Sequence, residues 1–189
     1  HSIANVANSL PKNKILFKQV IPELLGQNSQ QQLIAGGGVW PEPYEFESKT
    51  ERNSFFWARA ANEELAFLDN YNTAGTPPYY KEEWYLPAQY LTGDSIYWSK
   101  SYTDPYSQQP MVTCTSPIYK NDIFSGVATV DLKLQGISQL INQLTNPTDS
   151  YAFIVDRNNK FISFPKTGWV STLRKNNQAD FLYTDELTK

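Results

Sequence analysis

The sequence has a single histidine, a single cysteine and no long apolar run. The histidine is residue 1, so a histidine-based catalytic triad or zinc site has almost nothing from which it could be built. The one cysteine, Cys114, cannot form an internal disulfide. No stretch approaches the roughly 18 to 20 consecutive apolar residues that cross a bilayer. We therefore expect a soluble polypeptide, which could still be a piece of a membrane protein cut at its spans.

An excess of one charge is also missing, since 16 Lys and Arg face 19 Asp and Glu and the net charge is −3. This balance gives no long-range attraction for a polyanion, so we expect no nucleic-acid partner. Enzymatic motifs are absent too: there is no Gly-x-Ser-x-Gly and no metal-ligand spacing, and the glycine run at 36–38 lacks the Lys-Ser or Lys-Thr of a phosphate-binding loop. We expect the domain not to be an enzyme and to use no metal or cofactor.

Aromatic residues, by contrast, are abundant, with five Trp, twelve Tyr and ten Phe. The first 35 residues hold only one of them and instead place apolar residues at helical spacing. This pattern predicts a long amphipathic N-terminal helix within residues 1–38, which Pro11 and Pro22 either bend or divide into two helices, with Pro22 in a first turn. The glycine run should end helical structure. The apolar stripe suggests a homodimer contact, and packing against its own domain is the alternative.

The residues after the glycine run favour an antiparallel sheet. Residues 110–119 and 125–134 form the clearest hairpin, and residues 55–57 and 64–68 are two further candidate strands. One apolar helical face follows and ends before Pro147, after which residues 151–164 predict a second hairpin. We therefore predict an α+β fold in which a complete sheet module spans residues 39–146. A second module, small or incomplete, spans residues 147–189.

Aromatic and acidic side chains gather between residues 79 and 131, where the sequence has Tyr79, Tyr80, Glu82, Glu83, Trp84, Tyr85, Tyr97, Trp98, Tyr102, Asp104 and Asp131. In one interpretation the rings fill the core of a sheet while the acids cap turns or face water. In the other they form an aromatic box with an acidic rim for a cationic ligand. A ring face over an ammonium contributes roughly 0.5 to 2 kcal/mol, and a desolvated carboxylate adds charge pairing.

Three motifs in order suggest a family: Trp84 and Tyr85, then Tyr102-x-Asp104, then Gly126-Val127 followed by Asp131. This set resembles the double Cache (PAS-like, PDC) sensor domain of bacterial transmembrane receptors. The resemblance implies an N-terminal helix beside two stacked PAS-like modules, with the ligand in the membrane-distal one, here residues 39–146. It also implies the periplasmic or otherwise extracytoplasmic portion of a cell-membrane signalling protein. The cytoplasmic output module would be a histidine kinase, a diguanylate cyclase or a chemoreceptor.

The amino-acid-binding branch of this family has Arg-x-Trp-Tyr, in which the arginine grips the ligand carboxylate and two aspartates hold its ammonium. The residues here that match the branch are Trp84, Tyr85, Tyr102, Asp104 and Asp131. Glu82 stands where the arginine should be. An ion pair at contact is worth about 4 kcal/mol at an effective dielectric of 20, so a ligand carboxylate would now be repelled.

The resulting hypothesis is a small cationic ligand without a carboxylate: a primary amine, a quaternary ammonium such as choline, or a diamine whose far end meets Glu82. The resemblance implies something similar, because an amine-binding branch departs from the amino-acid pattern in this region. Trp57 and Trp98 are possible further walls of the box or simply core residues.

Several alternatives stay open. Glu82 could point to water in a pocket adapted to an amino acid or another small molecule. A carbohydrate-binding module would place its aromatic side chains on one flat surface. A glycosidase would need two carboxylates, such as Glu82 and Asp104, about 5 to 9.5 Å apart across an open cleft.

Overall fold

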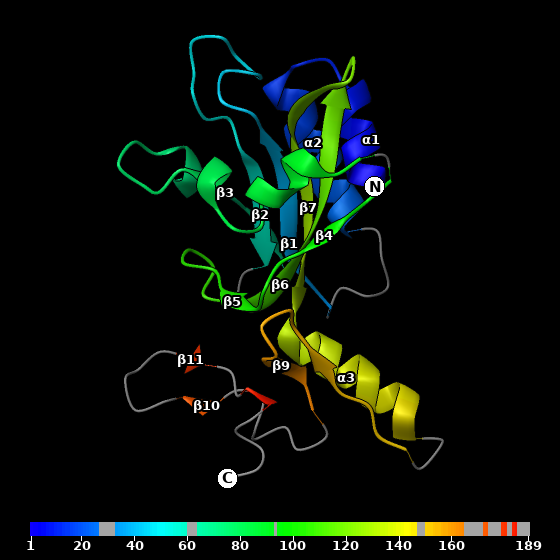
Figure 1. Ribbon diagram of the computed structural model, residues 1–189. Helices are drawn as coiled ribbons and strands as arrows, with labels where there is room; N and C mark the ends of the chain where they lie inside the picture. The colour runs from blue at the N-terminus through cyan, green and yellow to red at the C-terminus, as the bar shows by residue number, and fades with distance from the viewer. Residues whose placement is uncertain are drawn as a thin grey trace.

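The computed structural model describes residues 1–26, 33–59, 64–92, 94–146, 150–164, 172–173, 179–180 and 183–184. Its main body is an antiparallel sheet with strand order β3-β2-β1-β7-β6-β4, and β5 also pairs with β6 (Figure 1). The strands of this sheet are β1 (Ile34–Pro41), β2 (Phe55–Arg59), β3 (Leu65–Leu68), β4 (Tyr97–Trp98), β5 (Tyr102–Thr103), β6 (Pro110–Lys120) and β7 (Ile123–Lys133). The predicted α+β class is confirmed.

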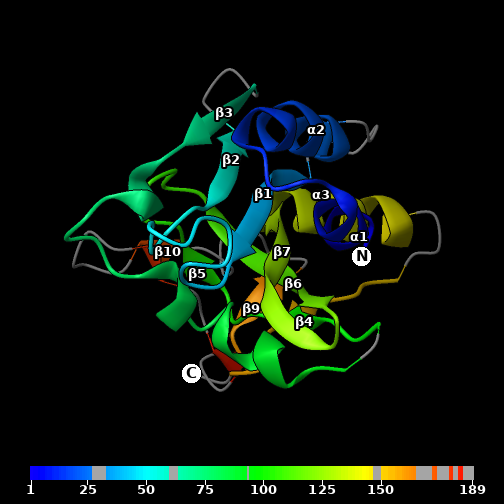
Figure 2. The same cartoon turned by 90° about the horizontal axis from the view of Figure 1, so that it is seen from above.

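Two helices, α1 (Ser2–Ser9) and α2 (Lys14–Gly26), cover one face of the sheet (Figure 2). The prediction of one long helix is wrong, and the two-helix alternative holds with a different break. The chain becomes extended at Leu10, because the residue before a proline is disfavoured in the helical region. The side-chain oxygen of Asn13 then accepts hydrogen bonds from the backbone N–H groups of Ile15 and Leu16 at 2.8 and 3.3 Å, which caps the start of α2. Pro22 lies inside α2 rather than in its first turn.

The apolar stripe of the N-terminal region is buried against the sheet. Ile3, Phe17 and Ile21 lie in one core cluster with Phe55 and Trp57 of β2. The alternative of packing within the domain therefore describes these three residues.

The glycine run lies in strand β1 and does not end a helix, so the predicted boundary at residue 38 is wrong. β1 pairs with β2 on one side and with β7 on the other. A Cβ on Gly36 would overlap the backbone carbonyl oxygen of Trp57, and a Cβ on Gly38 would overlap that of Phe55. Glycine is required here because backbones approach closely at the centre of the sheet.

The predicted hairpins are present. β6 and β7 join at Asn121 and Asp122, which both adopt positive φ, 50° and 62°, as a tight two-residue hairpin turn requires. β2 and β3 also pair, while the turn predicted between them, at residues 61–63, lies outside the described residues. The helix predicted before Pro147 is α3 (Leu134–Thr145).

The residues predicted to form a second module begin below the sheet, beside α3 (Figure 1). β8 (Ile154–Val155) and β9 (Phe161–Ser163) form the second predicted hairpin, and β10 (Thr172–Leu173) pairs with β11 (Ala179–Asp180). Ile137 of α3 and Ile162 of β9 share a small core cluster with Val112 of β6, which links the hairpin of β8 and β9 to the main sheet. None of the helices in the described part of the chain has the length and apolar character needed to cross a bilayer.

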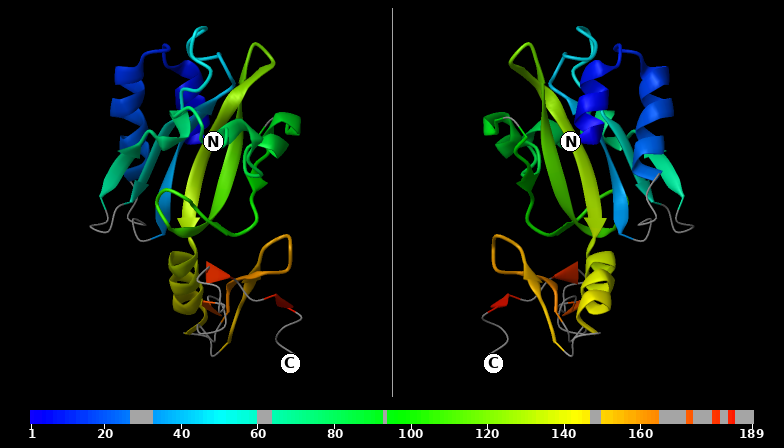
Figure 3. Two further views of the ribbon diagram at one scale, coloured as in Figure 1. Left: turned by 90° about the vertical axis from the view of Figure 1, so that its left-hand side faces the viewer. Right: turned by 90° about the vertical axis from the view of Figure 1, so that its right-hand side faces the viewer.

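The other face of the sheet is covered by the segment that runs from β3 to β5 (Figure 3). This segment contains three short 3-10 helices, Asn70–Asn72, Tyr79–Lys81 and Leu86–Tyr90. It closes a second core whose buried aromatic residues are Trp40, Phe56, Tyr71, Tyr79, Trp84 and Tyr85. Much of the aromatic excess therefore fills a core, as the first interpretation of the sequence expected.

Candidate ligand-binding site

Asp131 lies on β7, on the face covered by the aromatic segment. It stands opposite Thr113 of β6, whose hydroxyl donates to Oδ1 of Asp131 at 2.8 Å. Asp131 is only 2% exposed. Within the described ranges its carboxylate has no other hydrogen bond and no salt bridge. A buried carboxylate in this position lacks the positive charge that normally compensates its desolvation.

The pKa of Asp131 is raised to about 7, first by burial and then by the charge of Asp104, while the hydrogen bond from Thr113 lowers it. The carboxyl group thus sits between two states near neutral pH. Either a proton or an adjacent positive charge would compensate the burial of this carboxyl group. This is the response expected of a desolvated acid that shares its site with a second acid.

Asp104 is 1% exposed and has partners on both oxygens. Its Oδ1 accepts the hydroxyl of Tyr71 at 2.6 Å. Its Oδ2 accepts the backbone N–H and the hydroxyl of Ser107 at 2.6 and 2.7 Å, together with the backbone N–H of Tyr106 at 3.2 Å. Asp104 therefore caps the turn that follows β5, and its charge remains close to Asp131.

Tyr102 and Glu82 complete the acidic group. The hydroxyl of Tyr102 is 2.7 Å from that of Thr113. Burial, Asp131, Asp104 and Glu82 all raise the pKa of Tyr102, and the contact with Thr113 lowers it. The three acids predicted from the sequence therefore all lie close enough for their charges to raise the pKa of Tyr102.

Glu82 is partly buried, which does not fit a side chain that simply points into water. Burial raises its pKa, the charge of Asp104 raises it further, and Lys100 lowers it. Lys100 is exposed. The local balance around the site is therefore negative, with three carboxyl groups and one nearby ammonium.

Aromatic rings lie beside these acids. Trp84 packs on Trp40 with ring centroids 4.7 Å apart, and the backbone carbonyl of Trp84 accepts the hydroxyl of Thr115 at 2.8 Å. Tyr71, which bonds to the carboxylate of Asp104, lies 5.0 Å from Trp40, centroid to centroid. The indole N–H of Trp40 donates to the hydroxyl of Thr129 at 2.9 Å.

Three functional candidates were missed by sequence reasoning: Trp40, Tyr71 and Thr113. Trp40 follows the glycine run and would have been found by alternation along β1, had that run been interpreted as a strand. Thr113 could be placed only by the register that sets it opposite Asp131. Nothing in the sequence distinguishes Tyr71 from the other tyrosines of its segment.

Two other predicted residues lie elsewhere. Trp57 packs under the helices, 5.2 Å from Phe67, on the opposite face of the sheet. Trp98 is 42% exposed and stands opposite Cys114 of β6. Cys114 follows Thr113, which faces Asp131, and side chains alternate along a strand, so Cys114 and Trp98 lie on the opposite face of the sheet. Neither tryptophan is a wall of the site.

Tyr85 lies on the correct face but near the turn between β6 and β7. Its hydroxyl donates to the carboxylate of Glu42 at 2.7 Å, and its ring is 6.0 Å from that of Phe124. Tyr85 therefore anchors the covering segment, whereas Asp131 lies near the other end of β7. The buried positions of Trp40, Trp57 and Trp84 also differ from the exposed aromatic surface expected of a carbohydrate-binding module.

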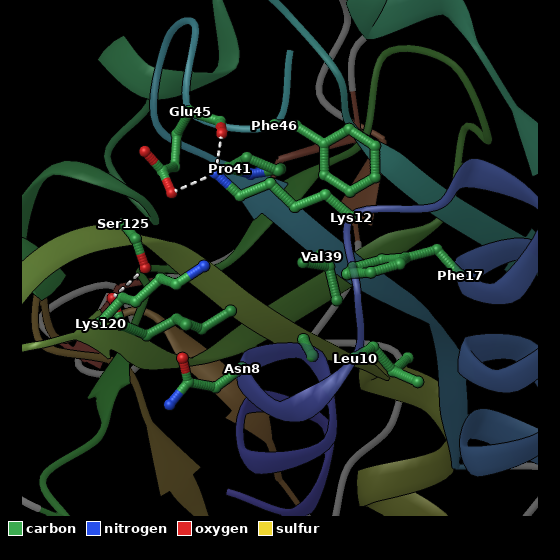
Figure 4. A pocket seen from close by; sticks show the side chains of 12 residues that line it. Asn8, Leu10, Lys12, Phe17, Val39, Pro41, Glu45, Phe46, Lys120 and Ser125 are labelled. Carbon is green, nitrogen blue, oxygen red and sulfur yellow. Dashed lines mark hydrogen bonds and ion pairs between the residues drawn. The ribbon is translucent and has the colours of Figure 1, made fainter. Parts of the chain in front are cut away.

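A separate small pocket lies between the link from α1 to α2 and the sheet (Figure 4). Lys12 and Glu45 both line it, and Nζ of Lys12 lies 2.6 Å from Oε1 of Glu45. Its volume of about 50 Å³ suits a few water molecules and falls well below the several hundred Å³ of ordinary ligand sites. A larger cavity of about 490 Å³ at the junction of the modules is lined mainly by apolar residues and includes Trp98. None of Glu82, Asp104 and Asp131 lines either cavity.

Known proteins share this architecture. The first PDC sensor domain of methyl-accepting-chemotaxis-protein-like receptors matches residues 18–139. The methyl-accepting chemotaxis protein McpC of Bacillus subtilis (strain 168) is 29% identical over 100 residues, which are 52% of this chain and 14% of that protein. The extracellular domain of a protein described as histidine kinase mmHK1S-Z3 has a TM-score of 0.65 at 21% identity. The match covers 87% of this chain and 60% of that domain. The ligand-binding domain of the Campylobacter jejuni chemoreceptor Tlp3, solved with 4-methylisoleucine, has a TM-score of 0.60 at 14% identity, with coverages of 93% and 63%.

The structural likenesses show a shared fold. The chain spans 14% of the length of McpC and 60 to 63% of the two solved domains. The predicted resemblance to PDC or Cache sensors is confirmed, and the family is one of sensor domains that are not themselves catalytic. The chain belongs to the family of first PDC sensor domains of methyl-accepting-chemotaxis-protein-like receptors.

Proposed function

We propose that residues 39–146 bind a small organic cation that lacks a carboxylate, such as a primary amine, a quaternary ammonium or a diamine. The observation that carries this proposal is Asp131, a fully buried carboxyl group with no cationic partner in the described part of the chain. A bound cation would supply the missing charge. It would also shift Asp131 to its ionised form, because an adjacent positive charge lowers the pKa of a carboxyl group.

The surroundings of Asp131 favour a cation over an anion or a neutral sugar. Asp104 and Glu82 add negative charge, and Trp84, Trp40 and Tyr71 add aromatic surface on the same face of the sheet. A cation 4 Å from one carboxylate gains about 4 kcal/mol at an effective dielectric of 20, and a carboxylate at the same place would meet repulsion of similar size.

We further propose that the chain is the extracytoplasmic, ligand-sensing part of a membrane-anchored signalling protein. This proposal rests on the family match and on relatives named as a chemotaxis protein and a histidine kinase. These names favour a chemoreceptor or histidine kinase output module, and a diguanylate cyclase remains a third option.

An α-amino acid is the second candidate, favoured by one observation. Lys100 lies close enough to Glu82 to lower its pKa and could meet a ligand carboxylate in place of the missing arginine. The Tlp3 domain was solved with 4-methylisoleucine, which is also an amino acid. Lys100→Ala separates the two candidates: it should leave choline binding within about twofold and should abolish binding of an amino acid that relies on this ammonium.

A thermal-shift screen tests the proposal. The panel contains choline, 1,4-diaminobutane, amino acids, organic acids and sugars, and a ligand at 100 times its Kd should stabilise the domain by about 2.7 kcal/mol. We expect amines or quaternary ammonium compounds to raise Tm, and Asp131→Asn to abolish the shift. Asp94→Asn is the matched control, because Asp94 is exposed. A response to amino acids or organic acids alone would contradict the cationic ligand, and a response to sugars alone would favour a carbohydrate-binding module.

The affinity for choline should depend on pH. Below about pH 7 the carboxyl group of Asp131 keeps a proton that the cation must displace, so the Kd should rise by up to about tenfold for each pH unit below 7 and level off above it. Titration calorimetry between about pH 5.5 and 8.5 measures this dependence. A Kd that does not change with pH would remove Asp131 from the site.

Glu82 should distinguish a diamine from a monovalent cation. Glu82→Gln removes the charge that the far ammonium of 1,4-diaminobutane would meet, so its Kd should rise about tenfold, while the Kd for choline should change by less than about threefold. Equal losses for both ligands would show that Glu82 does not contact the far end.

A further inference from the structure

The turn between β8 and β9 binds the chain segment that enters the ligand site. Oδ2 of Asp156 accepts the backbone N–H of Ser101 at 2.9 Å and its hydroxyl at 2.8 Å. Oδ1 accepts the backbone N–H groups of Asn158 and Lys160 at 2.8 and 3.1 Å. Asp156 and Ser101 are both buried. This carboxylate therefore fixes its own turn with one oxygen and the distal module with the other.

The charge of Asp156 is stable in this position. Burial raises its pKa, but the hydrogen bonds from Ser101, Lys160 and Asn158 outweigh this effect and lower it. Asp156 is thus ionised at neutral pH, and its bonds to Ser101 are charge-assisted, which makes them stronger than bonds between neutral groups.

Arg157, the next residue of the turn, makes a second contact with the same module. Its guanidinium donates to the backbone carbonyl of Trp98 at 2.7 Å and lies 4.1 Å from the centroid of the Tyr97 ring. The hydroxyl of Tyr97 donates to the carboxylate of Glu83. The turn thereby reaches the segment that holds Glu82.

Both contacts end next to residues of the ligand site. Ser101 directly precedes Tyr102, and Glu83 directly follows Glu82. Between them, the hydroxyl oxygen of Ser99 accepts the backbone N–H of Thr113 at 2.9 Å, and Thr113 is the residue that donates to Asp131.

We infer that Asp156 is a positioning residue of the ligand site, and that docking of the turn at residues 156–159 and occupancy of the site are coupled. The contact joins the first module to the start of the second, so it provides a route by which ligand binding in one changes the other. The coupling to a ligand rests on the proposed function. If a ligand strengthens the docking, the docking must strengthen ligand binding by the same factor.

Two measurements test the inference. Each is made on three proteins: the wild-type domain, the Asp156→Ala variant and the Asn158→Ala variant. Asn158 is a matched control, because its side chain is exposed and only its backbone bonds to Asp156. In titration calorimetry the Kd for choline should rise about tenfold in Asp156→Ala and stay within about twofold in the control. In hydrogen exchange, choline should slow exchange in residues 154–163 of the wild type and not in Asp156→Ala, which a purely structural role for Asp156 would not produce.

The outcomes separate this inference from the proposed function. An unchanged Kd for choline in Asp156→Ala, or no protection of residues 154–163 by choline in the wild type, would overturn the coupling. If the wild type binds neither choline nor 1,4-diaminobutane, the proposed function fails, and exchange without ligand then decides the positioning role. In that measurement, Asp156→Ala must speed hydrogen exchange in residues 97–104 relative to Asn158→Ala. An unchanged exchange rate would overturn the positioning role of Asp156. If Asp156→Ala does not fold, Ser101→Ala replaces it in both measurements, because it removes only the hydroxyl contact.

Discussion

Replacement of Asp131 by asparagine should stabilise the ligand-free domain at high pH. The substitution keeps the size of the side chain and an oxygen that can accept the hydroxyl of Thr113, and it removes the charge. A carboxyl group whose pKa rises from 3.8 to about 7 on folding resists ionisation by about 4 kcal/mol, at 1.36 kcal/mol for each tenfold change in proton affinity. At pH 8 the wild-type chain must bury an ionised Asp131, whereas the asparagine carries no charge. We therefore expect Asp131→Asn to raise the free energy of unfolding by about 2 to 4 kcal/mol at this pH.

The sign of the pH dependence follows from the same shift. Between pH 3.8 and about 7 the folded chain holds a proton on Asp131 that the unfolded chain has released. The wild type therefore loses stability as pH rises through this window, and the loss is complete above it. Asp131→Asn should remove this part of the slope, so the two proteins should have similar free energies of unfolding near pH 4 and differ most at pH 8.

Urea denaturation at several pH values between about 4 and 8 measures this difference. Asp94→Asn serves as the control, because Asp94 is exposed and should leave the slope unchanged. If Asp131→Asn is less stable than the wild type at pH 8, or keeps the same pH slope, then Asp131 is not an uncompensated buried acid and the reasoning for a cationic ligand fails.

Two other substitutions test the fold and the support of the site. Gly38→Ala should destabilise the domain by about 1 to 3 kcal/mol in urea denaturation, because the new Cβ would overlap a backbone oxygen of β2. Gly26→Ala is the control, since nothing lies within 4 Å of its Cβ, and it should be neutral or slightly stabilising. Equal effects of the two substitutions would contradict the tight packing of β1. Tyr71→Phe should lower the free energy of unfolding by about 1 to 2 kcal/mol, because it removes the hydrogen bond to Asp104. Tyr90→Phe, at a residue that is 80% exposed, should leave the free energy of unfolding almost unchanged. If Tyr71→Phe is as stable as the wild type, this hydrogen bond does not stabilise the fold.

The sequence predicted the elements whose signals are local. The hairpin of β6 and β7 has apolar runs on both sides of a polar turn, and Asn121 and Asp122 tolerate the positive φ that this turn needs. The helix α3 has a clear apolar face and stops before Pro147. The three site acids were found by motif spacing, and the fold then brings all three close enough to raise the pKa of Tyr102.

The errors come from contacts between distant segments. The glycine run is equally compatible with a helix end and with a strand whose neighbours approach closely, and only the pairing of β1 with β2 and β7 decides. The faces of Trp57 and Trp98 depend on strand pairing, which sets the alternation of side chains. The role of Thr113 depends on the register that sets it opposite Asp131.

The central claim is that the site accepts a cation and rejects a carboxylate. The most direct test is titration calorimetry at pH 8 with two pairs, choline against glycine betaine and 1,4-diaminobutane against ornithine. Glycine betaine has a carboxylate in place of the hydroxymethyl group of choline, and ornithine has one in addition to the two amines. We predict that at least one cation binds and that its carboxylated partner binds at least about tenfold more weakly. Tighter binding of glycine betaine or ornithine than of its partner, or no binding of either cation, would contradict the account.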